Sequence, residues 1–302
     1  MEVSMKTDSL QKAYKDFDFI KPNSLEEISE ILAKEKGRAQ IAAGCTDIIP
    51  SLRKKLISPE KMVSIKGIPG LSYVEQDEDV VRIGATTTMT DLIESDLIRE
   101  NFPALLKAAE NVGSRHIQNS ATVVGNLCNA SPAADTAPPL LVYRAALKIM
   151  NQGKEREVEL RNFFLGPRKT VLVPGDIVTE IILPFPNENS KSLFIKHGKR
   201  KALEISIVSV AVNLSFDENG KITEAHISCG SVGPTPILAE KTATKLVGLK
   251  VQGDEDLAFI LEAISSEISP IDDVRSTGEY RRYVTCVLTK RAILACCGKG
   301  DY

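Results

Sequence analysis

Residues 121–139 read Ala-Thr-Val-Val-Gly-Asn-Leu-Cys-Asn-Ala-Ser-Pro-Ala-Ala-Asp-Thr-Ala-Pro-Pro. Small, hydroxylated and turn-forming residues dominate this stretch, which favours a long binding loop over a helix or a strand. We expect its backbone amides at Val123, Val124, Gly125 and Asn126 to point at an anion. Asp135, further along the same stretch, is a candidate partner for a sugar hydroxyl.

A shorter run of similar character, Ala42-Ala43-Gly44-Cys45-Thr46-Asp47, follows the short apolar strand predicted at 40–43. Gly44 allows the backbone to approach a ligand closely, while Thr46 and Asp47 add a hydroxyl group and an acceptor. By itself this run is also typical of an ordinary turn. Neither run matches the dinucleotide-binding or P-loop fingerprint, so no Rossmann site or ATPase is predicted. Together, the two runs predict a ligand with two phosphates.

Length and charge restrict the possible classes of protein. A chain of 302 residues exceeds the usual size of one hydrophobic core, which predicts two domains. The 38 basic and 40 acidic residues nearly cancel, so we expect neither nucleic acid nor a membrane as partner. The charged N-terminal segment does not resemble a signal peptide, and no apolar run approaches the length of a membrane span. We therefore expect a cytoplasmic protein.

Cysteine and histidine offer little independent chemistry. The six cysteines form no CxxC pair and have no histidine at ligand spacing, so we expect reduced thiols and no metal site. His116 and His226 are interpreted as structural. We predict no catalytic residue in this chain.

The first two-thirds of the chain mixes helices and strands. Ser24 and Glu27 have capping-box spacing, and the apolar residues after them predict a helix that ends at Gly37. A hairpin is expected across 151–154. The other predicted strands are 40–43, 62–65, 80–85, 145–150, 155–160 and 177–183, and the other predicted helices are 90–94 and 103–111.

Residues 184–191, rich in Pro and Asn, are the best linker candidate. We therefore expect domains at 14–186 and 190–298. In the second domain, a long strand at 205–216, a turn and a return strand at 221–231 predict a hairpin. Helices are expected at 239–246, 255–268 and 278–296, so the domain is predicted to be an antiparallel sheet covered by helices.

Several motifs now support a family resemblance. Ala43-Gly44-Cys45-Thr46-Asp47, Thr122-Val123-Val124-Gly125-Asn126 and Ala130-Ser131-Pro132-Ala133-Ala134-Asp135 resemble the FAD-binding (medium) subunit of the molybdenum hydroxylases, the xanthine dehydrogenase and carbon monoxide dehydrogenase family. Later signatures of that family occur in the same order and extend the resemblance over nearly the whole chain. They are residues 178–184, 199–201 leading to 205–208, 273–275 and 279–282.

The resemblance implies an α+β fold: a two-part FAD-binding domain of the vanillyl-alcohol-oxidase (PCMH) type, followed by the smaller domain. It also implies an FAD that receives electrons from the two-iron two-sulfur clusters of a small subunit and passes them to an acceptor such as NAD. A large molybdopterin-binding subunit would oxidise the substrate, in a complex expected to be a dimer of heterotrimers. The alternatives are a stand-alone flavin oxidoreductase of the same fold and a flavin-free scaffold subunit.

The resemblance also places the cofactor contacts. Both loops would hold the pyrophosphate, Asp135 would bind the adenosine end, Val112 the adenine side, and Val178 and Lys196 the flavin, with Phe194 beside the ring. In the family, glycine is common where this chain has Cys45 and Val124, which puts one contact of each loop in question. The complete expected set is Ile41, Ala42, Ala43, Gly44, Cys45, Thr46, Asp47, Ile48, Val112, Thr122, Val123, Val124, Gly125, Asn126, Asp135, Val178 and Lys196.

Two charged clusters have other interpretations. The basic run at 199–201 is either a solvated face or a group that neutralises reduced flavin or docks an anionic partner. The cluster at 273–282 is interpreted as an ion-pair network or a subunit interface rather than as a catalytic site.

Overall fold

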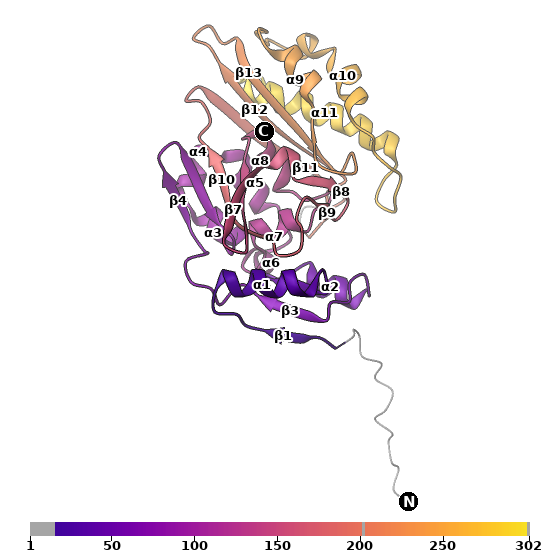
Figure 1. Cartoon of the computed structure of the whole chain (residues 1–302). Coiled ribbons are helices and arrows are strands. Elements are labelled where there is room, and N and C mark those ends of the chain that lie inside the picture. The colour runs from indigo at the N-terminus through magenta and orange to yellow at the C-terminus, as the bar shows by residue number, and fades with distance from the viewer. Residues whose placement is uncertain (1–15, 201–202, 301–302) are drawn as a thin grey trace, which may run out of the picture.

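The computed structural model describes residues 16–200 and 203–300, arranged as three stacked parts (Figure 1). A small parallel sheet with α1 and α2 forms one end, a five-stranded sheet with several short helices forms the middle, and a four-stranded sheet with α9, α10 and α11 forms the other end. Residue 14, with which the first domain was expected to begin, and Lys201 lie outside the described residues.

The first part is a three-stranded parallel sheet in the order β1-β3-β2. The Ser24 side chain caps helix α1 by accepting a hydrogen bond from the Glu27 amide, as the spacing predicts. Ile28 and Val63 are fully buried between this helix and the sheet. The elements are β1 Asp18–Ile20, α1 Leu25–Glu35, β2 Ala39–Ala42, α2 Ile48–Arg53 and β3 Lys61–Ser64.

The middle part is an antiparallel sheet in the order β4-β5-β10-β6-β7, with short helices packed on it. Fully buried side chains such as Phe102 and Phe163 fill its core. Its strands are β4 Val74–Asp77, β5 Val80–Gly84, β6 Ala146–Asn151, β7 Lys154–Glu159, β8 Phe164–Gly166, β9 Lys169–Thr170 and β10 Ile177–Pro184. Its helices are α3 Met89–Glu94, α4 Asp96–Asn101, α5 Pro103–Glu110, α6 Arg115–Gln118, α7 Val123–Cys128, α8 Ala137–Val142 and the 3-10 turn Leu160–Asn162.

The third part is an antiparallel sheet in the order β11-β12-β13-β14. Alternate residues of β12, including Val208, Val210 and Val212, pack against the helices, while the opposite face of the sheet contacts α5 and α8 of the middle part. The elements are β11 Ser190–His197, β12 Val208–Phe216, β13 Ile222–Gly230, β14 Ile237–Leu238, α9 Glu240–Leu246, the 3-10 turn Asp254–Leu257, α10 Ile260–Glu267 and α11 Gly278–Cys296.

The predicted fold class is confirmed, but some elements differ. The strand expected at 205–216 begins only at Val208, and the helix expected at 255–268 is divided into a 3-10 turn and α10. The principal error concerns residues 121–139, which contain α7 and α8 instead of one irregular loop. Thr122 caps the first of these helices, and every residue of the second is buried, so tertiary packing outweighs the low helix propensity.

Within residues 16–200 and 203–300, no helix combines the length and apolar character needed to cross a membrane.

Candidate cofactor site

The first predicted loop connects β2 to α2 and presents consecutive amides. Cys45 has a φ of 60°, in the left-handed region that glycine adopts most easily. No described residue accepts a hydrogen bond from the amides of residues 44–48. A run of unpaired N–H groups around a left-handed residue forms a concavity suited to an anion.

The second predicted loop presents fewer free amides than expected. The Val123 amide donates to the Thr87 carbonyl at 3.1 Å, and the Gly125 amide donates to Thr122 Oγ1 at 3.1 Å. The Asn126 amide donates to the Thr122 carbonyl at 3.0 Å. Of the expected four, only the Val124 amide has no acceptor among the described residues, because the segment folds as the capped first turn of α7.

Gly44 brings the two segments together. A Cβ on Gly44 would lie 2.0 Å from the carbonyl oxygen of Ser120 and 3.0 Å from Cα of Ala121. Only glycine permits this approach, so the first loop lies directly beside the start of the second segment. The sequence predicted the pairing of the loops, and the close contact at Gly44 explains how it is achieved.

Asp135 and Lys196, distant in sequence, form a buried ion pair between the middle and third parts. Lys196 Nζ donates to Asp135 Oδ2 at 2.6 Å and to the Asn111 carbonyl, adjacent to Val112, at 2.9 Å. The Ser206 hydroxyl donates to the other carboxylate oxygen. Burial raises the pKa of Asp135, while Lys196 and Ser206 oppose this effect.

The resemblance assigned Asp135 to the adenosine end of FAD and Lys196 to the flavin. The structure places these two side chains in direct contact, and Lys196 also reaches the carbonyl of Asn111, next to Val112. Val112, Asp135 and Lys196 therefore form one group, and the part of FAD that each contacts stays a prediction.

Other expected residues belong to the hydrophobic core or to the strand that precedes the first loop. Val178, on β10, and Phe194, on β11, belong to the same buried core as Val123 and Val124. Ile41 and Ala42 end the strand that leads into the first loop. These apolar side chains fix the backbone that carries the free amides.

Arg168 and Ser206 also belong to this region and were not assigned a role from the sequence. Arg168 donates from its amide to the Ala130 carbonyl at 2.9 Å and from its guanidinium to Ser51 Oγ on α2 at 3.5 Å. It thus joins the two segments, and it adds a positive charge beside them. No motif marks Arg168, whereas a serine inside the apolar run 205–208 was a detectable signal for Ser206.

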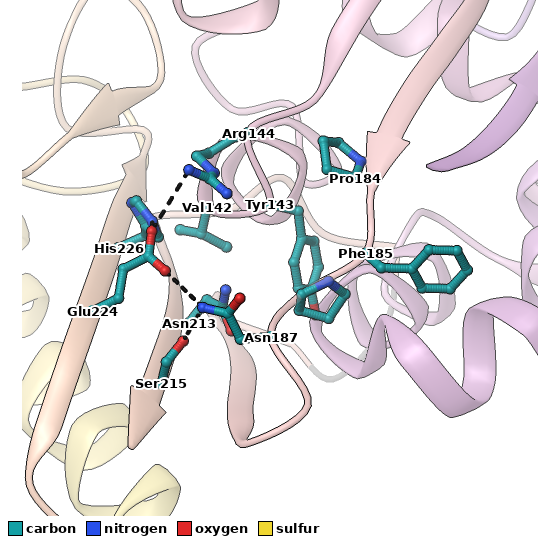
Figure 2. A pocket seen from close by; sticks show the side chains of 11 residues that line it. Val142, Tyr143, Arg144, Pro184, Phe185, Asn187, Asn213, Ser215, Glu224 and His226 are labelled. Atoms are coloured by element: carbon teal, nitrogen blue, oxygen red, sulfur yellow. Dashed lines mark hydrogen bonds and ion pairs between the residues drawn. The ribbon is translucent and has the colours of Figure 1, made fainter. Parts of the chain in front are cut away.

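A small hollow lies where α8, residues 184–187 and the third sheet meet (Figure 2). Its lining includes Tyr143, Asn187, Asn213, Glu224 and His226. Its volume of about 10 Å³ is small. Its lining contains none of the expected cofactor contacts, although it begins at Val142, at the end of α8.

The residues present fit FAD. The free amides of 44–48 suit a diphosphate, and the group formed by Val112, Asp135 and Lys196 provides a mixed apolar and charged wall. Bound FAD would supply reversible electron and proton uptake at its isoalloxazine ring.

The chain belongs to the family of FAD-binding subunits of molybdopterin dehydrogenases. Residues 15–186 match the family described as FAD binding domain in molybdopterin dehydrogenase, and residues 194–296 match the CO dehydrogenase flavoprotein C-terminal domain. The chain is therefore an oxidoreductase subunit, of the kind found in dehydrogenase complexes.

Individual relatives support this assignment. The chain is 33% identical to the nicotinate dehydrogenase FAD-subunit of Eubacterium barkeri, over 78% of this chain and 80% of the relative. It is 32% identical to a putative xanthine dehydrogenase FAD-binding subunit of Escherichia coli (strain K12), over 87% and 90% of the two chains. The solved structure of reconstituted CO dehydrogenase from Oligotropha carboxidovorans matches with a TM-score of 0.91 and 26% identity, covering 95% of this chain and 99% of that one.

Proposed function

We propose that this chain is the electron-transfer subunit of a molybdenum-containing hydroxylase or dehydrogenase. In this proposal, electrons from two-iron two-sulfur clusters in a small partner subunit pass through the FAD of this chain to an acceptor such as NAD. A large molybdopterin-binding subunit oxidises the substrate, and the assembly is a dimer of heterotrimers in the cytoplasm. The six cysteines, all without disulfide bonds, are consistent with that reducing compartment.

The observation that carries the proposal is the run of unpaired amides at residues 44–48, held beside the second segment by Gly44. We assign the pyrophosphate to these amides and to that of Val124, with the rest of 41–48 and 122–126 shaping the loops. As the resemblance implies, we assign the Lys196 ammonium and Val178 to the flavin, and Val112 and Asp135 to the adenosine half, where Asp135 also holds Lys196 in place. Arg168 adds positive charge near the phosphates.

The cofactor assignment is tested by purifying the chain and treating it with acid. We expect a yellow protein that releases FAD in a near-equimolar amount. A protein that stays colourless, and that binds no FAD on reconstitution, would contradict the proposal.

The subunit assignment needs a separate measurement. We expect a tagged chain expressed in its native cells to co-purify with a molybdopterin-containing chain and a chain carrying two-iron two-sulfur clusters. If the isolated FAD-loaded chain instead turned over a small-molecule substrate without partners, it would be a stand-alone flavin oxidoreductase.

A further inference from the structure

The face of the third sheet that packs on the middle part is polar although it is buried. Ser209 lies opposite Lys196 on one neighbouring strand and opposite Gly230 on the other. A Cβ on Gly230 would lie 2.4 Å from Ser209 Oγ and 3.2 Å from Cγ of Pro138, so this face is directed at α8. Farther along the same face lie Asn213 and Ser228.

Three polar atoms on this face lack partners. Ser209 Oγ, Ser228 Oγ and Asn213 Oδ1 make no hydrogen bond within the described part of the chain. Ser209 and Ser228 are 0% exposed, and Asn213 is 7% exposed. Because an unpaired buried polar atom costs about 1–3 kcal/mol, such atoms in native proteins are normally satisfied by internal water.

The spacing of these atoms suits bridging water. Diagonal neighbours on paired strands lie about 7–8 Å apart, and each hydrogen bond to water spans about 2.8 Å. Ser209 to Ser228 and Ser228 to Asn213 are both diagonal neighbours, as the register of β12 and β13 shows. One or two water molecules would be enough to bridge each gap.

Ionisable side chains lie at both ends of the line formed by Ser209, Ser228 and Asn213. At the inner end, the Lys196 ammonium pairs with Asp135 at 2.6 Å. At the outer end, Asn213 and His226 line the hollow of Figure 2, and His226 Nε2 lies 2.8 Å from Glu224 Oε1. Arg144, also at the outer end, lies 3.6 Å from the same carboxylate and is mostly exposed, so this end meets solvent. The hollow itself has room for about one water molecule.

We propose that this polar seam, made of Lys196, Ser209, Ser228, Asn213, His226 and Glu224, conducts protons from solvent to the flavin. The inference rests on the proposed electron-transfer function. Iron–sulfur clusters supply electrons only, whereas full reduction of a flavin takes up two electrons and at least one proton. The clusters of the partner subunit lose the two electrons, and solvent loses the proton.

Within the seam, the proton enters at the His226–Glu224 pair and moves along water held by Asn213, Ser228 and Ser209. At the inner end, the Lys196 ammonium would hold a proton beside bound FAD and would be reprotonated from the Ser209 side. Asp135 keeps the positive charge of Lys196 balanced during this exchange.

The test compares proton uptake with electron uptake in the full-length FAD-loaded chain. Reduced methyl viologen, which gives up electrons without releasing protons, reduces the flavin in a weakly buffered stopped-flow experiment, in which flavin absorbance follows the electrons and a pH-indicator dye follows the protons. Asn213→Leu and Ser228→Ala are the seam variants, and the second removes only one hydroxyl group. Thr289→Val is the matched control, because Thr289 is a buried hydroxyl on α11, on the other side of the sheet.

In both seam variants, we expect the rate of proton uptake to be about tenfold lower than the rate of flavin reduction. Proton uptake should remain in step with reduction in Thr289→Val, and all three variants should keep their FAD content and flavin midpoint potential. Proton uptake that stays in step with reduction in Ser228→Ala would overturn the seam and show that the flavin takes protons directly from solvent. Failure of the unsubstituted chain to bind FAD would instead contradict the proposed function itself.

Discussion

At the scale of single residues, Gly44 has the most demanding environment of the site. Replacing it with Ala would place a methyl group 2.0 Å from the Ser120 carbonyl oxygen, which forces the two loops apart. We expect Gly44→Ala to lower the free energy of unfolding by about 1–3 kcal/mol and to weaken FAD binding. Urea unfolding and fluorescence titration with FAD measure the two effects.

Gly67→Ala is the control for this prediction. The nearest atom to its added Cβ is the Pro22 carbonyl oxygen at 3.9 Å, which is ordinary contact. Equal losses in the two variants would mean that the contact between Gly44 and Ser120 has no special role.

Cys45 occupies a left-handed backbone position that glycine tolerates better than any residue with a side chain. We expect Cys45→Gly to bind FAD at least as tightly as the natural chain. Cys45→Val should lose about 1–2 kcal/mol of stability, because a β-branched residue is strained at positive φ. Tighter FAD binding by Cys45→Val than by Cys45→Gly would contradict this account. Val124 raises no such question, since it lies in the first turn of α7.

At the scale of elements, the start of α7 depends on its cap. Thr122 Oγ1 accepts the hydrogen bond of the Gly125 amide at 3.1 Å. Thr122→Ala should destabilise the protein by about 0.5–2 kcal/mol, whereas Thr122→Ser should retain most of the stability. Thermal unfolding of both variants checks this, and similar losses for Ala and Ser would show that the cap contributes little.

The N-terminal end of α11 is held by ion pairs of Asp273. Burial raises the pKa of this carboxyl group, but hydrogen bonds from Arg275 and the charges of Arg275 and Arg281 outweigh burial and lower it well below its ordinary value. Because the pKa is lowered in the folded state, the ionised carboxylate stabilises the fold fully at pH values above its unfolded-state pKa of about 3.9. This stabilisation is lost as the pH falls from there towards the folded-state pKa. The network confirms one of the two interpretations of the 273–282 cluster.

We therefore expect Asp273→Asn to be less stable than the natural chain at pH 7, with a difference that persists down to about pH 4 and shrinks only as the pH falls further towards the lowered folded-state pKa. Urea-unfolding midpoints at pH 7 and at about pH 2 measure it. Asp254→Asn is the control, because Asp254 forms only an exposed ion pair with Lys290. A difference that grew on acidification would contradict the assignment.

At the scale of the whole molecule, the Asp135–Lys196 pair joins the middle part to the third part. Both side chains are about nine-tenths buried. Lys196→Met leaves the carboxylate without its counter-charge, for which we expect a loss of up to about 3–5 kcal/mol and weaker FAD binding. The raised pKa of Asp135 limits the loss, because the isolated carboxyl group can take up a proton.

The double variant Lys196→Met, Asp135→Asn separates the effect of charge from that of packing. It should recover part of the stability lost in Lys196→Met, since it removes the unpaired charge. Strictly additive losses in urea unfolding would show that the two groups are not coupled in the folded protein.

The sequence by itself determined most elements and the α+β class, because hydrophobic period, caps and turn residues are local properties of the chain. It also singled out the two segments whose role in holding the cofactor stays a prediction. It placed the linker at 184–191, and this domain boundary stays a prediction. Only the tertiary structure showed that residues 121–139 form α7 and α8, that most amides of the second segment are already paired, and that Asp135 contacts Lys196. The physical reason is that burial against distant segments decides these features: packing outweighs weak helix propensity, and a carboxylate finds its counter-charge across the fold. The polar seam has the same origin, because its unpaired atoms become buried only when the third sheet packs on α8.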